Sequence, residues 1–221
     1  MNLKYVLFDL DGTIADTCKG VTESVAYSLK KFGIRVDDIN SLRPFIGPPL
    51  SESFSEFYGF QGEKLEEAIR QYRLYYESDG WKACKIYEGI RELLIYLREN
   101  GIKICLATSK PEVFAVRILK YYDILQYFDY VGGADMDGIR VKKIDVLKWV
   151  TSQIEDFKYE DALMVGDRKY DKTGADGLGI KCVLIEYGFG SREELEKCEP
   201  FSIQSTVSDL QKFLDSLIKR G

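Results

Sequence analysis

Residues 5–13 decide the fold, and they read Tyr5-Val6-Leu7-Phe8-Asp9-Leu10-Asp11-Gly12-Thr13. The first four are apolar without alternation, as in a central strand of a parallel sheet that is buried on both faces. Two carboxylates follow directly, so this strand delivers acidic side chains to its carboxyl end. Ligands of open parallel sheets bind beyond the carboxyl ends of the strands. We therefore predict a functional site around Asp9 and Asp11.

The remainder of the chain alternates between strand-like and helical segments. Three further apolar runs have the length of strands, 102–108, 162–165 and 182–185, and a weaker strand is predicted to begin at 130–131. Four segments have apolar residues at helical spacing: 90–97, 111–122, 143–155 and 207–217. Pro111 is expected in the first turn of its helix. The alternation predicts an α/β protein with a parallel sheet.

Residues 16–83 break this alternation, because they contain helical patterns and no convincing strand. Apolar residues keep helical spacing over 21–32, 50–57 and 65–76, and Asp16 or Thr17 is expected to cap the first of these helices. We therefore predict two parts. An α/β core comprises 1–15 and 84–221, and a helical insert of residues 16–83 interrupts it after the first strand.

The composition of the chain excludes several kinds of partner, catalytic site and metal site. The chain has 221 residues, with 31 Lys+Arg against 36 Asp+Glu and a net charge of −5, so no nucleic-acid partner is expected. It contains no histidine, which excludes Ser-His-Asp catalysis and HExxH metal sites. A divalent metal would therefore be held by oxygen ligands, which favours Mg²⁺.

The cysteines and the hydropathy of the chain indicate the cellular compartment of the protein. The five cysteines are scattered and odd in number, without a CxxC pair, which fits a reducing compartment better than a disulfide framework. No signal-peptide pattern and no apolar stretch of bilayer length is present. We predict a cytoplasmic protein with no membrane partner, and the sequence leaves its oligomeric state open.

Polar residues follow four of the predicted strands: Asp9 with Asp11, Thr108 with Ser109 and Lys110, Arg140 with Lys142 and Lys143, and Asp167 with Asp171. Carboxylates gathered at one sheet edge are costly unless a cation neutralises them. Carboxylates from two strand ends make an oxygen site for Mg²⁺. Together with a lysine and a hydroxyl, such a site suits a phosphate group, and a carboxylate is a competent phosphoryl acceptor.

These segments, in this order, resemble the four motifs of the haloacid dehalogenase superfamily of phosphohydrolases. The motifs are Asp9–Thr13, Leu106–Pro111, Arg140–Lys143 and Gly166–Asp171, and the resemblance covers essentially the whole chain. A DxDGT segment with a later GDxxxD segment is its most specific part. The resemblance implies a Rossmann-like core with a small helical cap inserted after the first strand.

The resemblance also implies roles for the acids. Asp9 would attack phosphorus and become an aspartyl phosphate. Asp11 would protonate the leaving oxygen and then deprotonate the water that cleaves the intermediate. Mg²⁺ would be held by Asp9, by the backbone carbonyl of Asp11 and by Asp167, while Asp171 would order the metal-bound waters or the lysine of the site.

Thr108 and a lysine would hold the transferring phosphoryl group. We assign that lysine to Lys143, because Arg-x-x-Lys before an apolar helix resembles the family pattern, with Lys142 as the alternative. Thr108 could also cap the helix that follows it. Ser109, next to Thr108, is assigned to substrate binding.

The insert resembles the cap of the phosphoglycolate phosphatase-like branch in its segment Ile46–Leu50. Arg43, just before this segment, is our candidate for a cation that binds substrate, although an arginine beside a proline-bounded loop is more often a surface residue. Tyr72, Tyr75 and Tyr76 could stack on an aromatic substrate, but at helical spacing they fit the core of the cap better. Cys18 is expected to be a packed thiol.

The leading hypothesis is an Mg²⁺-dependent phosphatase that hydrolyses a small phosphorylated metabolite, with phosphoglycolate as the first substrate class. A 5'-nucleotidase-type activity is the alternative. A sugar phosphomutase is a further possibility, weakened because residues 16–20 lack the expected histidine. The second acid, Asp11, argues against dehalogenase chemistry. A receiver domain would be shorter and would lack the insert.

Overall fold

The structure is a computed structural model that describes residues 2–219. The chain divides into two compact units, Met1–Ala15 with Ile86–Gly221, and Asp16–Lys85. Residues 84 and 85, which the sequence analysis placed in the core, fall in the second unit.

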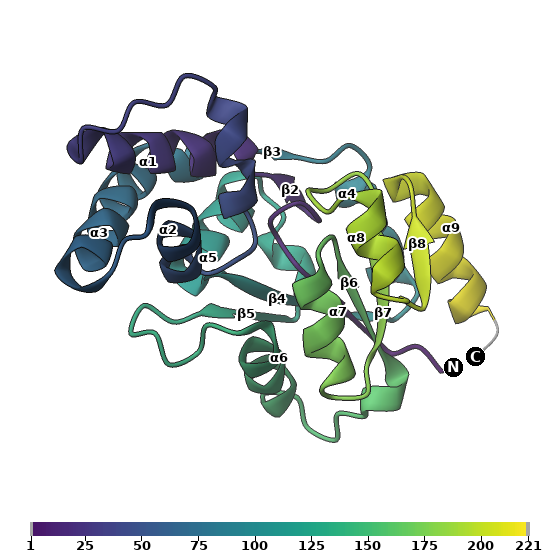
Figure 1. The fold of residues 1–221 in the computed structure, drawn as a ribbon. Coiled ribbons are helices and arrows are strands. Elements are labelled where there is room, and N and C mark those ends of the chain that lie inside the picture. Colours follow the sequence, from purple (N-terminus) through teal and green to yellow (C-terminus); the bar gives the residue numbers. More distant parts are fainter. Residues whose placement is uncertain (1, 220–221) are drawn as a thin grey trace. The chain divides into compact units, whose positions relative to one another are not determined.

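A six-stranded parallel sheet forms the centre of the first unit (Figure 1). Its order is β5-β4-β1-β6-β7-β8. The strands are β1 (Tyr5–Phe8), β4 (Lys103–Pro111), β5 (Tyr130–Ala134), β6 (Ala162–Gly166), β7 (Lys181–Ile185) and β8 (Ser202–Gln204). Phe8 pairs with Leu106 of β4 on one side and with Val165 of β6 on the other. The carboxyl ends of these three central strands therefore meet at one edge.

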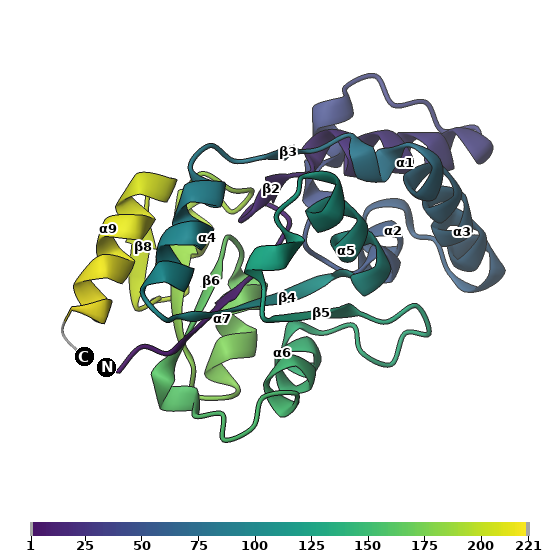
Figure 2. The same cartoon turned by 180° about the vertical axis from the view of Figure 1, so that it is seen from behind.

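Helices cover both faces of this sheet. They are α4 (Ile90–Glu99), α5 (Glu112–Tyr121), α6 (Lys143–Ser152), α7 (Lys169–Asp176), α8 (Arg192–Lys197) and α9 (Val207–Ile218), with short 3-10 turns η3 (Leu125–Tyr127) and η4 (Tyr159–Asp161). Helices α6 and α7 lie on the face seen in Figure 1, and α4 and α5 on the face seen in Figure 2. Buried residues of α6, α7 and α8, such as Val146, Ala175 and Leu195, pack with Leu7 and Met164 of the sheet.

The second unit is helical. It comprises α1 (Cys18–Lys31), η1 (Ile39–Phe45), α2 (Leu50–Tyr58), α3 (Gly62–Ser78) and η2 (Gly80–Lys82). The Ser28 hydroxyl of α1 donates to the Ala68 carbonyl of α3 at 2.7 Å, and the rings of Phe54 and Phe60 stack. A two-stranded ribbon of β2 (Ala15–Asp16) and β3 (Lys85–Ile86) lies where the chain passes between the units.

Some predicted boundaries were wrong. Strand β4 continues to Pro111, so this proline precedes α5 and does not sit in its first turn. Helix α6 ends at Ser152 and not at 155. Thr17 occupies the cap position of α1 without a side-chain cap bond, and the Asp16 carboxylate accepts from the Cys18 amide at 3.0 Å. Asp16 also belongs to β2, in a region where no strand was expected.

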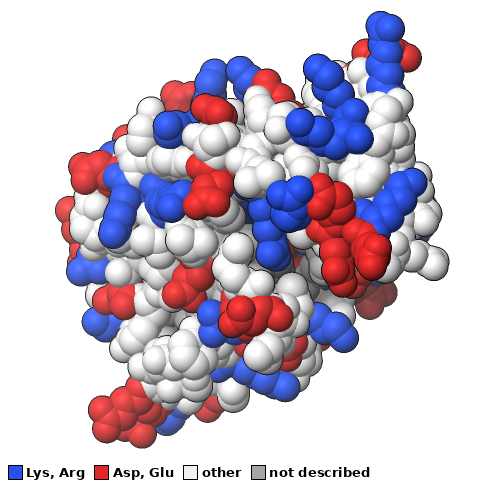
Figure 3. Space-filling model, turned by 90° about the vertical axis from the view of Figure 1, so that its left-hand side faces the viewer, with Lys and Arg blue, Asp and Glu red and all other residues white. Residues whose placement is uncertain are grey.

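The surface in Figure 3 mixes Lys and Arg with Asp and Glu, so neither sign of charge dominates that face. Over residues 2–219, no helix combines the length and apolar character that a bilayer crossing requires.

Candidate active site

Asp9 lies at the carboxyl end of β1. Its amide donates to the Val165 carbonyl at 3.0 Å, which extends the pairing with β6 by one residue and fixes the backbone. Beyond it the chain turns tightly, with the amides of Ile14 and Ala15 both donating to the Leu10 carbonyl at 2.9 Å. Gly12 has φ +78°, and a Cβ on it would lie 2.0 Å from Asp167 Oδ2. The glycine of the first motif is therefore required by its conformation and by its contact with a second acid.

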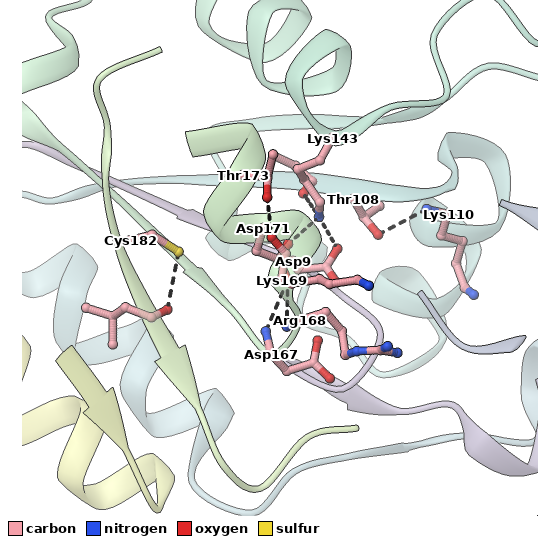
Figure 4. Close-up of polar contacts among 12 residues, drawn as sticks. Asp9, Thr108, Lys110, Lys143, Asp167, Arg168, Lys169, Asp171, Thr173 and Cys182 are labelled. Carbon is pink, nitrogen blue, oxygen red and sulfur yellow. Dashed lines mark hydrogen bonds and ion pairs between the residues drawn. The ribbon is translucent and has the colours of Figure 1, made fainter. Parts of the chain in front are cut away.

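Asp167 and Asp171 come from the turn between β6 and α7. Asp171 Oδ2 accepts from the amides of Asp167 at 3.2 Å and Arg168 at 3.0 Å, which closes the first turn of α7. Ligand oxygens of Asp9, Asp167 and Asp171 all lie within 4.8 Å of one another, and the three side chains are buried. Figure 4 shows Asp9, after β1, Asp167, in the loop after β6, and Asp171, in α7, close to one another.

Lys143 connects two of these acids. Its Nζ lies 2.7 Å from Asp9 Oδ1 and 2.8 Å from Asp171 Oδ1, and it donates to the Ala107 carbonyl at 2.9 Å. Lys143 is the first residue of α6 and is buried, whereas Lys142 is exposed at the cap position of that helix. The structure thus brings the first-choice lysine of the third motif to the acids.

Burial and like charge shift the pKa values of this cluster. Burial raises the pKa of Asp9 to about 6, although Lys143 opposes the shift. Burial, with the charges of Asp171 and Asp9, raises the pKa of Asp167 well above its usual range. Burial disfavours the charged form of Lys143, but the carboxylates of Asp171 and Asp9 outweigh it and raise its pKa. Three carboxylates around one ammonium leave an excess of negative charge that a cation would relieve.

One oxygen of the cluster supports a metal site directly. Asp167 Oδ1 is buried and has no hydrogen-bond partner, while Oδ2 accepts from the Phe189 amide at 2.7 Å. An unpartnered buried carboxylate oxygen is costly unless a ligand satisfies it. The donors are all oxygens, which suits Mg²⁺. Asp9, Asp167 and Asp171 therefore fit the expected ion.

Asp11 does not belong to the group of three acids and pairs with a lysine. Its side chain is 12% exposed, and its Oδ1 lies 2.8 Å from Nζ of Lys110, whose side chain is 5% exposed. The predicted ligand role of Asp11 concerns its backbone carbonyl and stays a prediction. Lys110 lies in the second motif, and no role was predicted for it. The feature of the sequence that could have indicated a site role for Lys110 is its position two residues after Thr108, the last residue of the predicted strand 102–108.

Thr108 is fully buried at the same edge, and its hydroxyl accepts from the Lys110 amide at 3.2 Å. It does not cap α5, whose cap position is Pro111, so that alternative was wrong. Ser109 is half-buried beside it.

The remaining candidates belong to the helical unit. Arg43 is exposed on η1. Tyr72 and Tyr76 are buried and stacked at 5.5 Å, and Tyr75 packs on Tyr27 at 5.2 Å, as the core interpretation expects. Burial raises the pKa of the half-buried Cys18 thiol, although Arg43 opposes the shift, so this thiol is not activated. The substrate role of Arg43 stays a prediction.

Comparison with known proteins now identifies the family. The model of the haloacid dehalogenase-like hydrolase family matches residues 6–185. This chain belongs to that family. The matched range includes all three buried acids and Lys143.

Individual relatives agree with this assignment. The chain is 36% identical over 211 residues to a 5'-nucleotidase of Pseudomonas aeruginosa, covering 96% of this chain and 95% of that protein. It is 36% identical to the tyrosine-protein kinase PtkA of Mycobacterium tuberculosis, covering 95% of this chain and 72% of the kinase. The crystal structure of a predicted phosphatase from Clostridium acetobutylicum is similar at a TM-score of 0.94 and 42% identity, covering 98% and 100% of the two chains. The chain is a phosphatase of this family, a phosphoric monoester hydrolase.

Proposed function

We propose that this phosphatase hydrolyses small phosphomonoesters with the help of Mg²⁺ and through an aspartyl phosphate on Asp9. The observation that carries the proposal is the buried cluster itself. Asp9 shares Lys143 with Asp171 and shares a set of converging carboxylate oxygens with Asp171 and Asp167. Such a cluster is destabilising as an empty structural feature but suits an anionic substrate bound with a cation.

In the first step, a carboxylate oxygen of Asp9 bonds to phosphorus while the bond from phosphorus to the ester oxygen breaks. Asp11 gives a proton to that departing oxygen. Lys143 and the Thr108 hydroxyl hold the phosphoryl oxygens and stabilise the charge on them. Asp9, Asp167 and Asp171, with the backbone carbonyl of Asp11, would hold Mg²⁺, which would supply further charge neutralisation of the phosphoryl group.

In the second step, a water oxygen bonds to the phosphorus of the aspartyl phosphate, and the bond from phosphorus to Asp9 breaks. Asp11 takes the proton from that water and thereby returns to its starting state. Inorganic phosphate is released and the Asp9 carboxylate is regenerated, so atoms and protons balance over the cycle.

For the substrate, nucleoside monophosphates come first. The 5'-nucleotidase relative covers nearly the whole of both chains, which favours this class. Phosphoglycolate, the first class suggested by the segment Ile46–Leu50, comes second. Arg43 and Ser109 are the residues that we propose to contact the substrate outside the phosphoryl group.

The test is phosphate release with Mg²⁺ from p-nitrophenyl phosphate, nucleoside monophosphates, phosphoglycolate, hexose phosphates and pyrophosphate. Turnover should disappear in EDTA and in Asp9→Asn, because an amide is not an effective nucleophile toward phosphorus. The ratios of kcat/KM across the panel would identify the substrate class. A folded protein that releases no phosphate from any of these compounds contradicts the proposal.

Transfer of the phosphoryl group to an acceptor other than water is a second candidate, favoured by the relative named a tyrosine-protein kinase. It uses the same aspartyl phosphate and differs only in what attacks it. Label from a ³²P-phosphomonoester that appears in a sugar or tyrosine hydroxyl faster than in inorganic phosphate would establish it.

A further inference from the structure

The segment between β7 and α8 packs unusually closely around Asp167. A Cβ on Gly188 would lie 2.4 Å from the Asp167 Cβ, and a Cβ on Gly190 would lie 2.1 Å from the Asp167 backbone oxygen. Any other residue at either position would have to displace the acid or its backbone. The two glycines therefore allow this segment to contact the loop after β6 directly.

Between these glycines, Phe189 selects which oxygen of Asp167 is available. Its amide donates to Oδ2 at 2.7 Å, and Oδ1 is left buried without a hydrogen-bond partner. This hydrogen bond restrains the rotation of the carboxylate. The available oxygen is thus determined by a backbone group outside all four motifs.

Glu194 of α8 holds the other side of the same loop. Its Oε1 accepts from Arg168 Nε and from the Lys169 amide, each at 2.9 Å, and its Oε2 accepts from Arg168 Nη2 at 3.3 Å. The Arg168 and Glu194 side chains are only 15% and 20% exposed. Ser191 caps α8 by accepting from the Glu194 amide at 3.1 Å. This two-point contact fixes the residue after Asp167 and the first residue of α7, the helix that carries Asp171.

We propose that Gly188, Phe189, Gly190 and Glu194 form a positioning element for the metal site, which we call the Asp167 cradle. Glu194 is its positioning residue, acting through Arg168 and the start of α7 on the spacing of Asp167 and Asp171. The proposal rests on the Mg²⁺ site of the proposed function. Mutation of a group that orients metal ligands commonly weakens metal binding about 10- to 100-fold.

The experiment compares Glu194→Gln with Glu193→Gln, its neighbour on the same helix. Glu193 is 78% exposed and pairs with Lys197 at 2.7 Å, away from the loop. Both variants remove one negative charge from α8, so they share the long-range effect on a cation. Only Glu194→Gln removes the charged partner of Arg168.

Metal affinity is measured without substrate, by titrating Mg²⁺ in a calorimeter and Mn²⁺ by electron paramagnetic resonance. The dissociation constant should rise about 10- to 100-fold more in Glu194→Gln than in Glu193→Gln, which reports the long-range charge effect alone. Arg168→Lys keeps the positive charge but cannot donate both guanidinium hydrogen bonds to Glu194, and it should weaken metal binding in the same way. The double variant Glu194→Gln/Arg168→Lys should bind Mg²⁺ no more weakly than the more impaired of the two single variants, because each single variant already breaks the same interaction.

Far-UV circular dichroism and the metal-free Tm show whether each variant is folded. A folded Glu194→Gln protein with the parent's affinity overturns the proposal, even if its Tm is lower, because Glu194 would then serve stability alone. A parent protein that binds no Mg²⁺ overturns it as well. If the parent binds Mg²⁺ with cradle-dependent affinity but hydrolyses no ester, only the proposed function fails.

Discussion

Lys143 is the residue on which the charge balance of the site depends most. Its Nζ lies within 2.8 Å of oxygens from two buried acids. Replacement by Met should abolish turnover. At pH 8 in EDTA it should also lower the free energy of unfolding by about 3–5 kcal/mol, since buried carboxylates would lose their partner. Urea denaturation and phosphate release measure the two effects.

Lys142→Met is the matched control, because Lys142 is adjacent, exposed and also a lysine. It should change stability by less than about 0.5 kcal/mol and leave turnover near that of the parent. Loss of turnover in Lys142→Met, with activity retained in Lys143→Met, would contradict the assignment of the third motif.

Asp9 predicts an unusual dependence of stability on pH. Its pKa of about 6 in the folded protein lies above the ordinary value of 3.8, so between these pH values the native state holds a proton that the unfolded state has lost. The contribution of this group to the free energy of unfolding is therefore fully present below about pH 4. It is lost as pH rises through 6, and the loss is about 3 kcal/mol. Asp167, also raised, acts in the same direction.

The measurement is urea unfolding in EDTA from pH 4 to pH 7, for the parent and for Asp9→Asn. Subtracting the free energy of unfolding of the variant from that of the parent removes the contribution of acids with lowered pKa values, such as Glu67 with a pKa of about 2, because both proteins contain them. The free energy of unfolding of Asp9→Asn, relative to that of the parent, should increase as pH rises from 4 to 6 and stay constant above pH 6. A difference that does not change with pH would show that Asp9 is not protonated in the native metal-free state.

At the scale of elements, Gly20 in α1 gives a prediction with an unexpected sign. Replacing glycine by alanine inside a helix normally stabilises by roughly 0.5–1 kcal/mol. Here the new Cβ would lie 2.0 Å from the Gly80 carbonyl oxygen of η2. Gly20→Ala should therefore destabilise the helical unit, by about 1–3 kcal/mol for an overpacked contact.

Urea unfolding followed by far-UV circular dichroism measures this change. Lys30→Ala, at an exposed position in the same helix, is the control and should stay within about 0.5 kcal/mol of the parent. A more stable Gly20→Ala protein would mean that α1 and η2 do not approach as described.

The elements that were predicted are those whose apolar pattern is strong. Strands β1, β4, β6 and β7 each contain a run of buried apolar residues, and α9 buries Val207, Leu210, Leu214 and Leu217 at regular spacing. Elements with little apolar content were missed. Strand β8 has three residues with one aliphatic side chain, and α8 reads REELEK with only Leu195 buried. Helix α7 was missed because its first turn carries site residues, and Asp171 closes that turn as well as facing Lys143.

The candidate site divides in the same way. Asp9, Thr108, Lys143, Asp167 and Asp171 could be named because each follows or adjoins a strand end in a recognisable motif, and the structure gathers them. Lys110, Phe189 and Glu194 could not be assigned. Phe189 acts through its amide, which carries no residue signature. Glu194 is one of three glutamates in α8, and only the fold shows which of them reaches Arg168.

The whole molecule consists of two units formed by one interrupted chain, and the candidate site residues are distributed unequally between them. The three acids, Lys143, Asp11 with Lys110, and the Asp167 cradle all belong to the first unit, Met1–Ala15 with Ile86–Gly221. The helical unit, Asp16–Lys85, has its own core, in which Phe45, Phe54 and Phe60 pack together. We propose that it acts as the cap over substrate, with Arg43 as its contribution.

This division predicts where Mg²⁺ slows amide exchange. A ligand stabilises the cooperative unit that binds it, so metal should protect 9–13, 166–171 and 186–190, where amides either adjoin the acids or hydrogen-bond to them. Helices α1 and α3 should exchange at the same rate with and without Mg²⁺, because none of the three acids lies in their unit. Hydrogen exchange read by mass spectrometry, with Ca²⁺ and Asp167→Asn as controls, measures both regions. Equal protection of α1 and α3 would mean that the two units open together, and that metal in the first unit already stabilises the second before any substrate is bound.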